Sequence, residues 1–170
     1  DNPQLSMVKY KQPQHHEVVF EFNQLLPSTS GWYKPEQFND DEYFQWTSEE
    51  CSNLSFSLSP QSDYTLQFTI CNIASEDILE SLIVKINNVG IDIQQISHVN
   101  NLRTYEGIVP QNTLQVQNDI TLQTNRVIQV EGADNRQLGL GFMNLYLIPL
   151  ENTSSLEEDS TQQEHDLHLQ

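Results

Sequence analysis

The sequence predicts an all-β protein, an antiparallel β-sandwich of the jelly-roll type with about eight to ten strands. Through most of the central part, apolar residues alternate with polar residues at a period of two. This alternation is typical of strands that turn one face to a core and the other to water. Turn-forming residues separate the runs, and no segment sustains an amphipathic helical pattern.

The predicted elements follow one another at short intervals. Alternating strand segments cover residues 53–58, 64–70, 82–86, 91–96, 114–116, 120–122 and 142–147. We expect hairpin loops at 59–63 and 87–90, the second because Asn and Gly tolerate a positive φ. Further breaks are expected at 110–112 and 117–119. Residues 76–80 are expected to form at most one short helical turn.

The length of 170 residues favours a single domain with its own core. We predict a polar linker over 1–16, the β-sandwich over 17–150 and an acidic tail over 151–170. The first residues lack a basic segment followed by an apolar one, so no signal peptide is visible and we expect a cytoplasmic protein. In that compartment Cys51 and Cys71 should be free, mostly buried thiols.

The formal net charge of −17 excludes several partners. Seven Lys and Arg against 24 Asp and Glu leave no broad basic face for a nucleic acid or an anionic membrane surface. No apolar run is long enough for membrane insertion. The charge gathers in two segments, −5 in residues 31–50 and −6 in 151–170. The acidic, aromatic segment 31–50 is therefore where we expect a neutral polar ligand.

Catalytic and metal-binding patterns are scarce, and we predict no enzyme activity, no catalytic residue, no metal site and no cofactor. His98 is the only histidine in the predicted sandwich, and the cysteines lack zinc-ligand spacing. His15 and His16 are adjacent in the predicted linker, where a solvated role is favoured over a metal site. The acids at 40–42 lack the alternating spacing of a calcium loop, which favours a solvated charge run. A hydrolytic pair of carboxylates that converge only in space stays open.

Two segments depart from this pattern and supply the candidate ligand-binding residues. The first contains Trp32, Tyr33, Glu36 and Trp46. Flat aromatic rings can stack on the C–H faces of sugars while carboxylates bind the sugar hydroxyls. The alternative is that the tryptophans fill the core of the sandwich, and for either tryptophan considered by itself we favour this alternative.

The second segment contains Asp134 and Arg136, and Arg136 is one of three arginines in the chain. Its guanidinium can bind a carboxylate through two parallel hydrogen bonds, and Asp134 and Glu36 are the candidate partners. Arg136 either ties this loop to the first strands through Glu36 or, together with Asp134, points into a ligand groove. The residue types leave both interpretations open.

These segments carry a family resemblance. They resemble a β-sandwich domain at the ends of bacterial glycosyltransferases and cell-surface polysaccharide proteins. The matching elements, in order, are Gly31-Trp32 to Glu36 with Trp46-Thr47, the hairpin 84–88, the stretch Tyr105 to Pro110, and Asp134-x-Arg136-x-Leu138-Gly139. Two positions depart from the family pattern. Gln45 stands where Arg often precedes the tryptophan, and Asn88 replaces the hairpin glycine, which should leave Gly90 to form the bend.

The resemblance implies a non-catalytic, carbohydrate-binding-like accessory module whose partners are a glycan or polysaccharide and a tethered or neighbouring glycosyltransferase domain. Trp32, Tyr33 and Trp46 would then stack on the ligand or frame its site, and Glu36, Asp134 and Arg136 would supply polar contacts or hold the framework. The alternative is a structural or protein–protein interaction β-sandwich without a sugar site. That alternative predicts two buried tryptophans and an Arg136 bound entirely by carboxylates of the protein.

Overall fold

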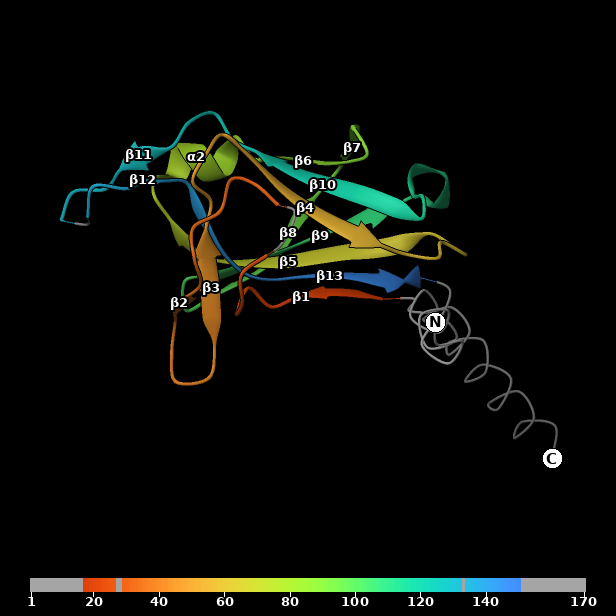
Figure 1. Ribbon diagram of the computed structural model, residues 1–170, viewed down its shortest axis with the longest axis horizontal. Helices are drawn as coiled ribbons and strands as arrows, with labels where there is room; N and C mark the ends of the chain where they lie inside the picture. Colours follow the sequence, from red (N-terminus) through yellow and green to blue (C-terminus); the bar gives the residue numbers. More distant parts are fainter. Residues whose placement is uncertain (1–16, 27–28, 133, 151–170) are drawn as a thin grey trace, which may run out of the picture.

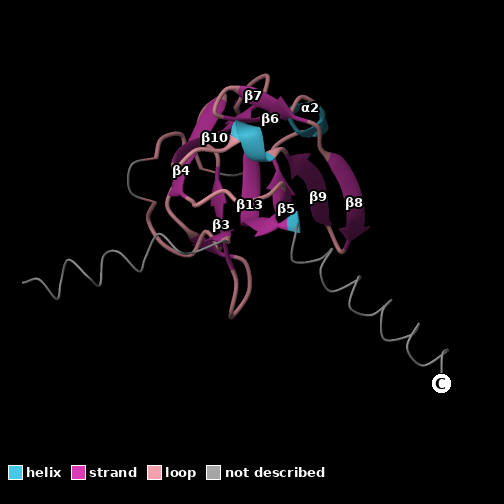
Figure 2. Cartoon of the chain, turned by 90° about the vertical axis from the view of Figure 1, so that its right-hand side faces the viewer, coloured by secondary structure: helices cyan, strands magenta, loops and turns pink. Residues whose placement is uncertain are grey.

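The computed structural model describes residues 17–26, 29–132 and 134–150, and it confirms an antiparallel β-sandwich. Two sheets form separate layers, and every recorded strand pair in the described residues is antiparallel (Figures 1 and 2). The predicted linker 1–16 and acidic tail 151–170 lie outside the described residues, so the predicted domain boundaries stay predictions.

The larger sheet has seven strands. They are β1 (Val18–Phe20), β2 (Glu36–Gln37), β3 (Tyr43–Trp46), β5 (Tyr64–Ile73), β8 (Gln94–Val99), β9 (Leu102–Val109) and β13 (Leu140–Pro149). Their order is β2-β3-β13-β5-β9-β8, and β1 pairs with β13 beside this path. Because β1 contacts residues 145–147 of β13 and β3 contacts residues 141–142, two short strands share the same edge of β13 (Figure 1).

The smaller sheet has four strands in the order β4-β10-β6-β7. Its members are β4 (Cys51–Ser57), β6 (Ile83–Ile86), β7 (Val89–Ile91) and β10 (Gln117–Gln123). The short strands β11 (Ile128–Gln129) and β12 (Gln137–Leu138) pair with each other. Within the described ranges the structure has one turn of α-helix, α2 (Glu76–Glu80), as expected, and a 3-10 turn, η2 (Gln111–Thr113), within the predicted break at 110–112.

The core lies between the two sheets and follows the predicted alternation. In β4 every second side chain is buried, with Leu54 at 0% exposure, and in β5 Leu66 and Phe68 are also at 0%. Strands of both sheets contribute to one buried cluster, which also takes in Phe22, Phe142 and α2 residues. Burial of this apolar surface is the main free energy that holds the sheets together.

A second, smaller apolar cluster lies on the opposite face of the larger sheet. Phe44, Cys71 and Met143 are its buried members, and Trp46 and Leu102 pack against it. Cys71 and Met143 directly follow core residues of β5 and β13, and successive side chains of a strand point to opposite faces. The outer face of this sheet is therefore apolar at one end.

Asparagine forms the tight turns of the hairpins. Asn87 and Asn88 have φ values of 51° and 68° between β6 and β7, and Asn100 and Asn101 have 52° and 67° between β8 and β9. Two consecutive positive φ angles are the requirement of a two-residue type I′ turn. The expectation that Gly90 forms the first bend was wrong: Asn88 does so, because its short polar side chain tolerates this conformation.

Several sequence-based expectations about strands need correction. The segment 114–116, expected to be a strand, lies between η2 and β10 and belongs to neither. The segment 59–63 is not a hairpin loop, because it connects β4 to β5 in the other sheet. The expected break at 117–119 is instead the beginning of strand β10. There the side-chain amide of Asn118 accepts a hydrogen bond from the backbone amide of Gln115 and donates one to the backbone carbonyl of the same residue. Strand β9 was not predicted; its residues from 102 to 106 are all half-buried, so it lacks a clear alternation.

The structure also bears on the two cysteines and on membrane-spanning helices. Cys51 and Cys71 are both free, as predicted, but only Cys71 is buried and Cys51 is exposed. Within the described ranges, no helix has both the length and the hydrophobicity needed to cross a bilayer.

Candidate functional site

Four of the six predicted site residues come together around one guanidinium, and we call Tyr33, Glu36, Asp134 and Arg136 the Arg136 cluster. Arg136 donates from Nη1 to Glu36 Oε2 at 2.7 Å and from Nε to Asp134 Oδ1 at 2.8 Å. Its guanidinium carbon lies 4.9 Å from the centre of the Tyr33 ring, within the range of a cation–π contact. Both hypotheses about its carboxylate partners are confirmed.

The Arg136 cluster ties the two ends of the fold together. Residues 36 and 136 are 100 positions apart, and the hydroxyl of Tyr33 donates to the carbonyl of Gln137 at 2.9 Å. Hydrogen bonding to both carboxylates raises the pKa of Arg136, and the guanidinium in turn holds the pKa of Asp134 below its usual value. The guanidinium therefore stays charged and is engaged by two carboxylates of the protein.

The remaining motif residues reinforce the same connection. The amide of Leu140 donates to Thr47 Oγ1 at 2.9 Å, and the amide of Gly139 donates to the Thr47 carbonyl at 3.1 Å. A Cβ on Gly139 would lie 2.4 Å from Thr47 Oγ1, so only glycine fits here. The first and last elements of the family resemblance thus contact each other in the folded protein. Their residue pattern is explained by these hydrogen bonds within the fold.

The two tryptophans belong to different apolar clusters. Trp32 packs against the main core, 5.1 Å from Phe22 and 5.6 Å from Phe142 between ring centres, and its Nε1 donates to the Asn53 carbonyl at 3.0 Å. Trp46 packs edge-on against Phe44 in the outer cluster. Both indoles are half-buried, so neither reaches the full burial that the core-filling alternative requires, and only Trp32 packs against the main core; their contact with a ligand stays a prediction.

Gln45, which stands where Arg is common in the resembling family, faces the interior. Its exposure is 1%, and its Nε2 donates to the Tyr33 carbonyl at 2.8 Å. At this position the side chain supports the segment that carries the Arg136 cluster and does not reach the surface.

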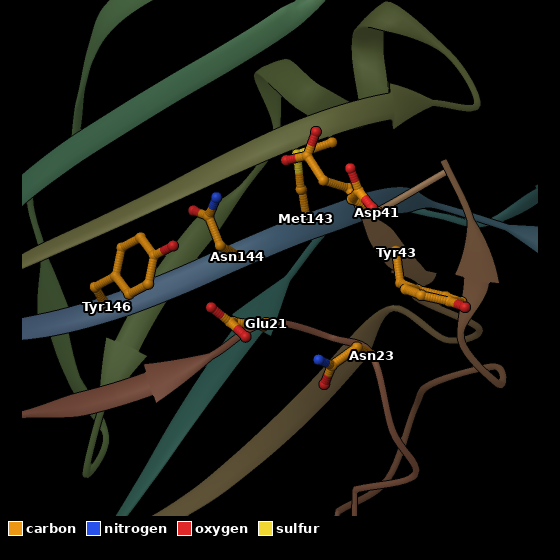
Figure 3. Close-up of a pocket in the computed structure, with 8 residues that line it drawn as sticks. Glu21, Asn23, Asp41, Tyr43, Met143, Asn144 and Tyr146 are labelled. Carbon is orange, nitrogen blue, oxygen red and sulfur yellow. The ribbon is translucent and has the colours of Figure 1, made fainter. Parts of the chain in front are cut away.

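A different place on the molecule has the form of a binding site, a cavity of about 130 Å3 beside β13 (Figure 3). We call it the β13 cavity. It is lined by Glu21, Asn23, Asp41, Glu42, Tyr43, Met143, Asn144 and Tyr146. None of the six predicted site residues lines it. Figure 3 shows that the lining side chains come from three segments, namely the chain after β1, the β2–β3 hairpin with the start of β3, and β13.

Local sequence explains why the first segment contributes polar groups. Phe22 is buried at 1% exposure with a φ of 53°, and it packs against Trp32 and Phe142. Its neighbours Glu21 and Asn23 are exposed. Burial of one aromatic ring therefore fixes the two polar side chains at the surface on either side of it.

The hairpin is shaped by one asparagine. Asn39 Oδ1 accepts hydrogen bonds from the amides of Asp41 at 3.0 Å and Glu42 at 2.8 Å, and its Nδ2 donates to Glu42 Oε1 at 2.8 Å. Figure 1 shows this hairpin projecting beyond the edge of the larger sheet. The acids at 40–42 therefore form the tip of a structured hairpin, and two of them line the cavity.

Strand β13 supplies the base of the cavity. Its pairing with β5 shifts register between Phe142 and Asn144, a bulge that interrupts the alternation. Met143 is buried in the outer apolar cluster, whereas Asn144 and Tyr146 are half-buried. The buried Oδ1 atom of Asn144 has no hydrogen-bond partner in the described part of the chain. An acceptor in this state is costly unless a ligand or water donates to it.

The electrostatic field of the β13 cavity is negative. Three of its eight lining residues are acids, and none is Lys, Arg or His. Burial raises the pKa of Tyr146, and the charges of Glu21 and Glu42 raise it further. In the part of the chain that the structure describes, no group of three His, Cys, Asp or Glu residues is placed to hold a metal ion.

Sequence reasoning found only part of this site. It selected the segment 31–50 for its charge and aromatic content, which includes Asp41, Glu42 and Tyr43. It missed the residues after β1 and those of β13, because nothing local indicates that the two ends of the chain meet here. The interrupted alternation at Met143 and Asn144 is the one signal that was available.

The sequence matches no protein-family model and no curated protein. Among solved structures, the chain is similar to a family 35 carbohydrate binding module from Clostridium thermocellum, with a TM-score of 0.45 and 11% sequence identity. This similarity covers 79% of the present chain and 99% of that module. At this level of similarity the functional conclusions below rest on the residues of the present chain, and its fold rests on the strand pairing described above.

Proposed function

We propose that this protein is a non-catalytic carbohydrate-binding module that holds a sugar residue in the β13 cavity. The observation that carries the proposal is the convergence of carboxylates, amides and tyrosines from three segments on one small cavity. Sugar hydroxyls both donate and accept hydrogen bonds. Glu21 and Asp41 can accept from them, and Asn23 can donate as well as accept.

The cavity also offers apolar surface for a sugar ring. Tyr43 is exposed at 37% and Tyr146 is half-buried, so both rings are partly accessible, and Met143 adds apolar surface to the lining. The volume of about 130 Å3 is well below the roughly 300–1,000 Å3 of typical small-molecule pockets. A site of this size suits one sugar residue rather than a chain segment, and affinity for a single residue would be low.

The finer part of the proposal is that this module serves a bacterial glycosyltransferase or polysaccharide-synthesis protein. It rests on the family resemblance of the sequence elements between residues 31 and 148. A tethered catalytic domain would raise the effective concentration of the glycan and compensate for weak binding at one site.

The direct test is calorimetric and NMR titration of the full 170-residue chain with bacterial polysaccharides and oligosaccharides at millimolar concentration. We expect binding that weakens in Asp41→Asn and persists in Glu80→Gln, a matched loss of one charge on the exposed surface of α2. No binding of any glycan, or equal loss in both variants, would overturn the proposal. Chromatography of the sugars afterwards detects cleavage, which would contradict the non-catalytic part, because the cavity does gather three carboxylates.

One observation favours the alternative, a structural or interaction β-sandwich without a sugar site. Arg136 is bound by two carboxylates of the protein, as that alternative requires. Tryptophan fluorescence separates the two functions: an emission spectrum that responds to neither sugar nor quencher favours the alternative if titration also detects no binding.

A further inference from the structure

The hydrogen-bonding groups of the β13 cavity are strongly biased towards acceptors. The carboxylates of Glu21, Asp41 and Glu42 only accept hydrogen bonds when they are ionised, so each offers acceptors and no donor. The donors are two amide groups and two tyrosine hydroxyls. A ligand that fits this set must donate more hydrogen bonds than it accepts.

The charge of the cavity points the same way. No cation lines it, and none of the four recorded ion pairs in the described residues involves its three acids. The negative charges of Glu21 and Glu42 contribute to the raised pKa of Tyr146, which also lines the cavity. A uronate would be repelled at this place, a neutral sugar would be tolerated, and a cation would be attracted.

We propose that the preferred ligand of the β13 cavity is a glycan with a free, protonated amine, that is, an amino sugar without its N-acetyl group. This inference rests on the proposed carbohydrate-binding function and names its ligand class. An ammonium donates three hydrogen bonds and accepts none, which matches the surplus of acceptors. Its charge complements the carboxylates of Glu21, Asp41 and Glu42.

The test compares four tetrasaccharides by calorimetric titration of the full chain: β-1,4-linked glucosamine, its fully N-acetylated form, cellotetraose and tetragalacturonic acid. We expect the glucosamine tetramer to bind about tenfold more tightly than the acetylated form, the effect of one charge-assisted hydrogen bond. Raising the salt concentration should reduce this difference, since ion pairing is screened.

Two variants separate site binding from general attraction of a cation to an acidic protein. Glu21→Gln should lose about tenfold in affinity for the glucosamine tetramer, whereas Glu80→Gln removes the same charge elsewhere and should change it less than about twofold. Both residues are exposed, so neither variant should disturb folding.

The outcomes are distinguishable. If neutral or acidic tetramers bind as tightly as the glucosamine tetramer, the amine preference is wrong while carbohydrate binding stands. If Glu21→Gln and Glu80→Gln lose affinity equally, attraction is non-specific and the inference is overturned. If none of the four sugars or the bacterial polysaccharides binds, the proposed function itself fails.

Discussion

The Arg136 cluster and the β13 cavity are both acidic and both contain tyrosine, yet their charges are arranged differently. In the Arg136 cluster, Glu36 and Asp134 share one guanidinium. In the β13 cavity, Glu21 and Asp41 face an open space that no cation lines. Paired charges lower the free energy of the folded state, whereas unpaired acceptors around a cavity are available to a ligand. This difference supports a structural role for the Arg136 cluster and underlies the proposed binding role of the β13 cavity.

The framework role is tested most severely at Gly139. In Gly139→Ala the new Cβ would lie 2.4 Å from Thr47 Oγ1 and would displace the acceptor of the Leu140 amide. We expect the free energy of unfolding to fall by about 3 kcal/mol, the sum of overpacking and a lost buried hydrogen bond. Urea denaturation measures it. Gly90→Ala is the control, because no atom lies within 4 Å of that Cβ, and equal losses would contradict the explanation.

The next expected effect is that of Arg136→Ala. It leaves Glu36 and Asp134 without their common partner, and we expect a loss of about 1.5 kcal/mol in unfolding free energy, typical of hydrogen bonds to charged groups. Affinity for the glucosamine tetramer should not change. A variant with wild-type stability and weakened sugar binding would reverse the comparison and restore Arg136 as a ligand contact.

Asn144→Leu tests the opposite prediction for the cavity. The variant removes a buried acceptor that has no partner in the described residues and replaces it with an apolar side chain of similar size. We expect the free energy of unfolding to rise by about 1 kcal/mol, because the desolvated acceptor is gone. Sugar affinity should fall at the same time. If stability drops instead, the oxygen is already satisfied in the free protein.

A smaller effect is expected in the pH dependence of stability, to which the ion pair of Arg136 with Asp134 contributes. Arg136 holds the pKa of Asp134 below its usual value, so this carboxylate stabilises the fold above its unfolded pKa of about 3.9. That contribution is lost as the pH falls towards the lowered folded value. Urea midpoints between neutral pH and acid should therefore decline less steeply in Arg136→Ala. Equal declines in wild type and variant would contradict this role of the ion pair.

The smallest expected effect concerns the outer apolar cluster, in which Cys71 is buried. Burial raises the pKa of Cys71 to about 12, with a contribution from Glu42, so its thiol should not react in the folded protein. Cys51 is exposed and should react with a thiol reagent. We expect one rapidly labelled cysteine in the native chain and two after unfolding. Rapid labelling of both in the native chain would show that the outer apolar cluster opens.

The sequence predicts local features well where they depend on neighbouring residues. Alternation places the core of β4 and β5, and consecutive asparagines form the turn at 87–88. Residues 31–50 were selected correctly as an unusual acidic segment, and Arg136 was assigned its two carboxylates. The connection 59–63 was misjudged because the same turn residues serve a hairpin and a crossing between sheets, and only the pairing of β4 with β10 distinguishes them.

The sequence by itself determined the all-β class, the tight turn at residues 87–88 and the strong acidic character of the chain, because these follow from residues close together along the chain. Only the tertiary structure decided which acids are paired and which are available. Glu36 meets Arg136 across 100 positions, and Glu21 meets Asn144 beside one cavity. These long-range arrangements depend on strand order and on the burial of Phe22 and Met143, which no local sequence pattern specifies.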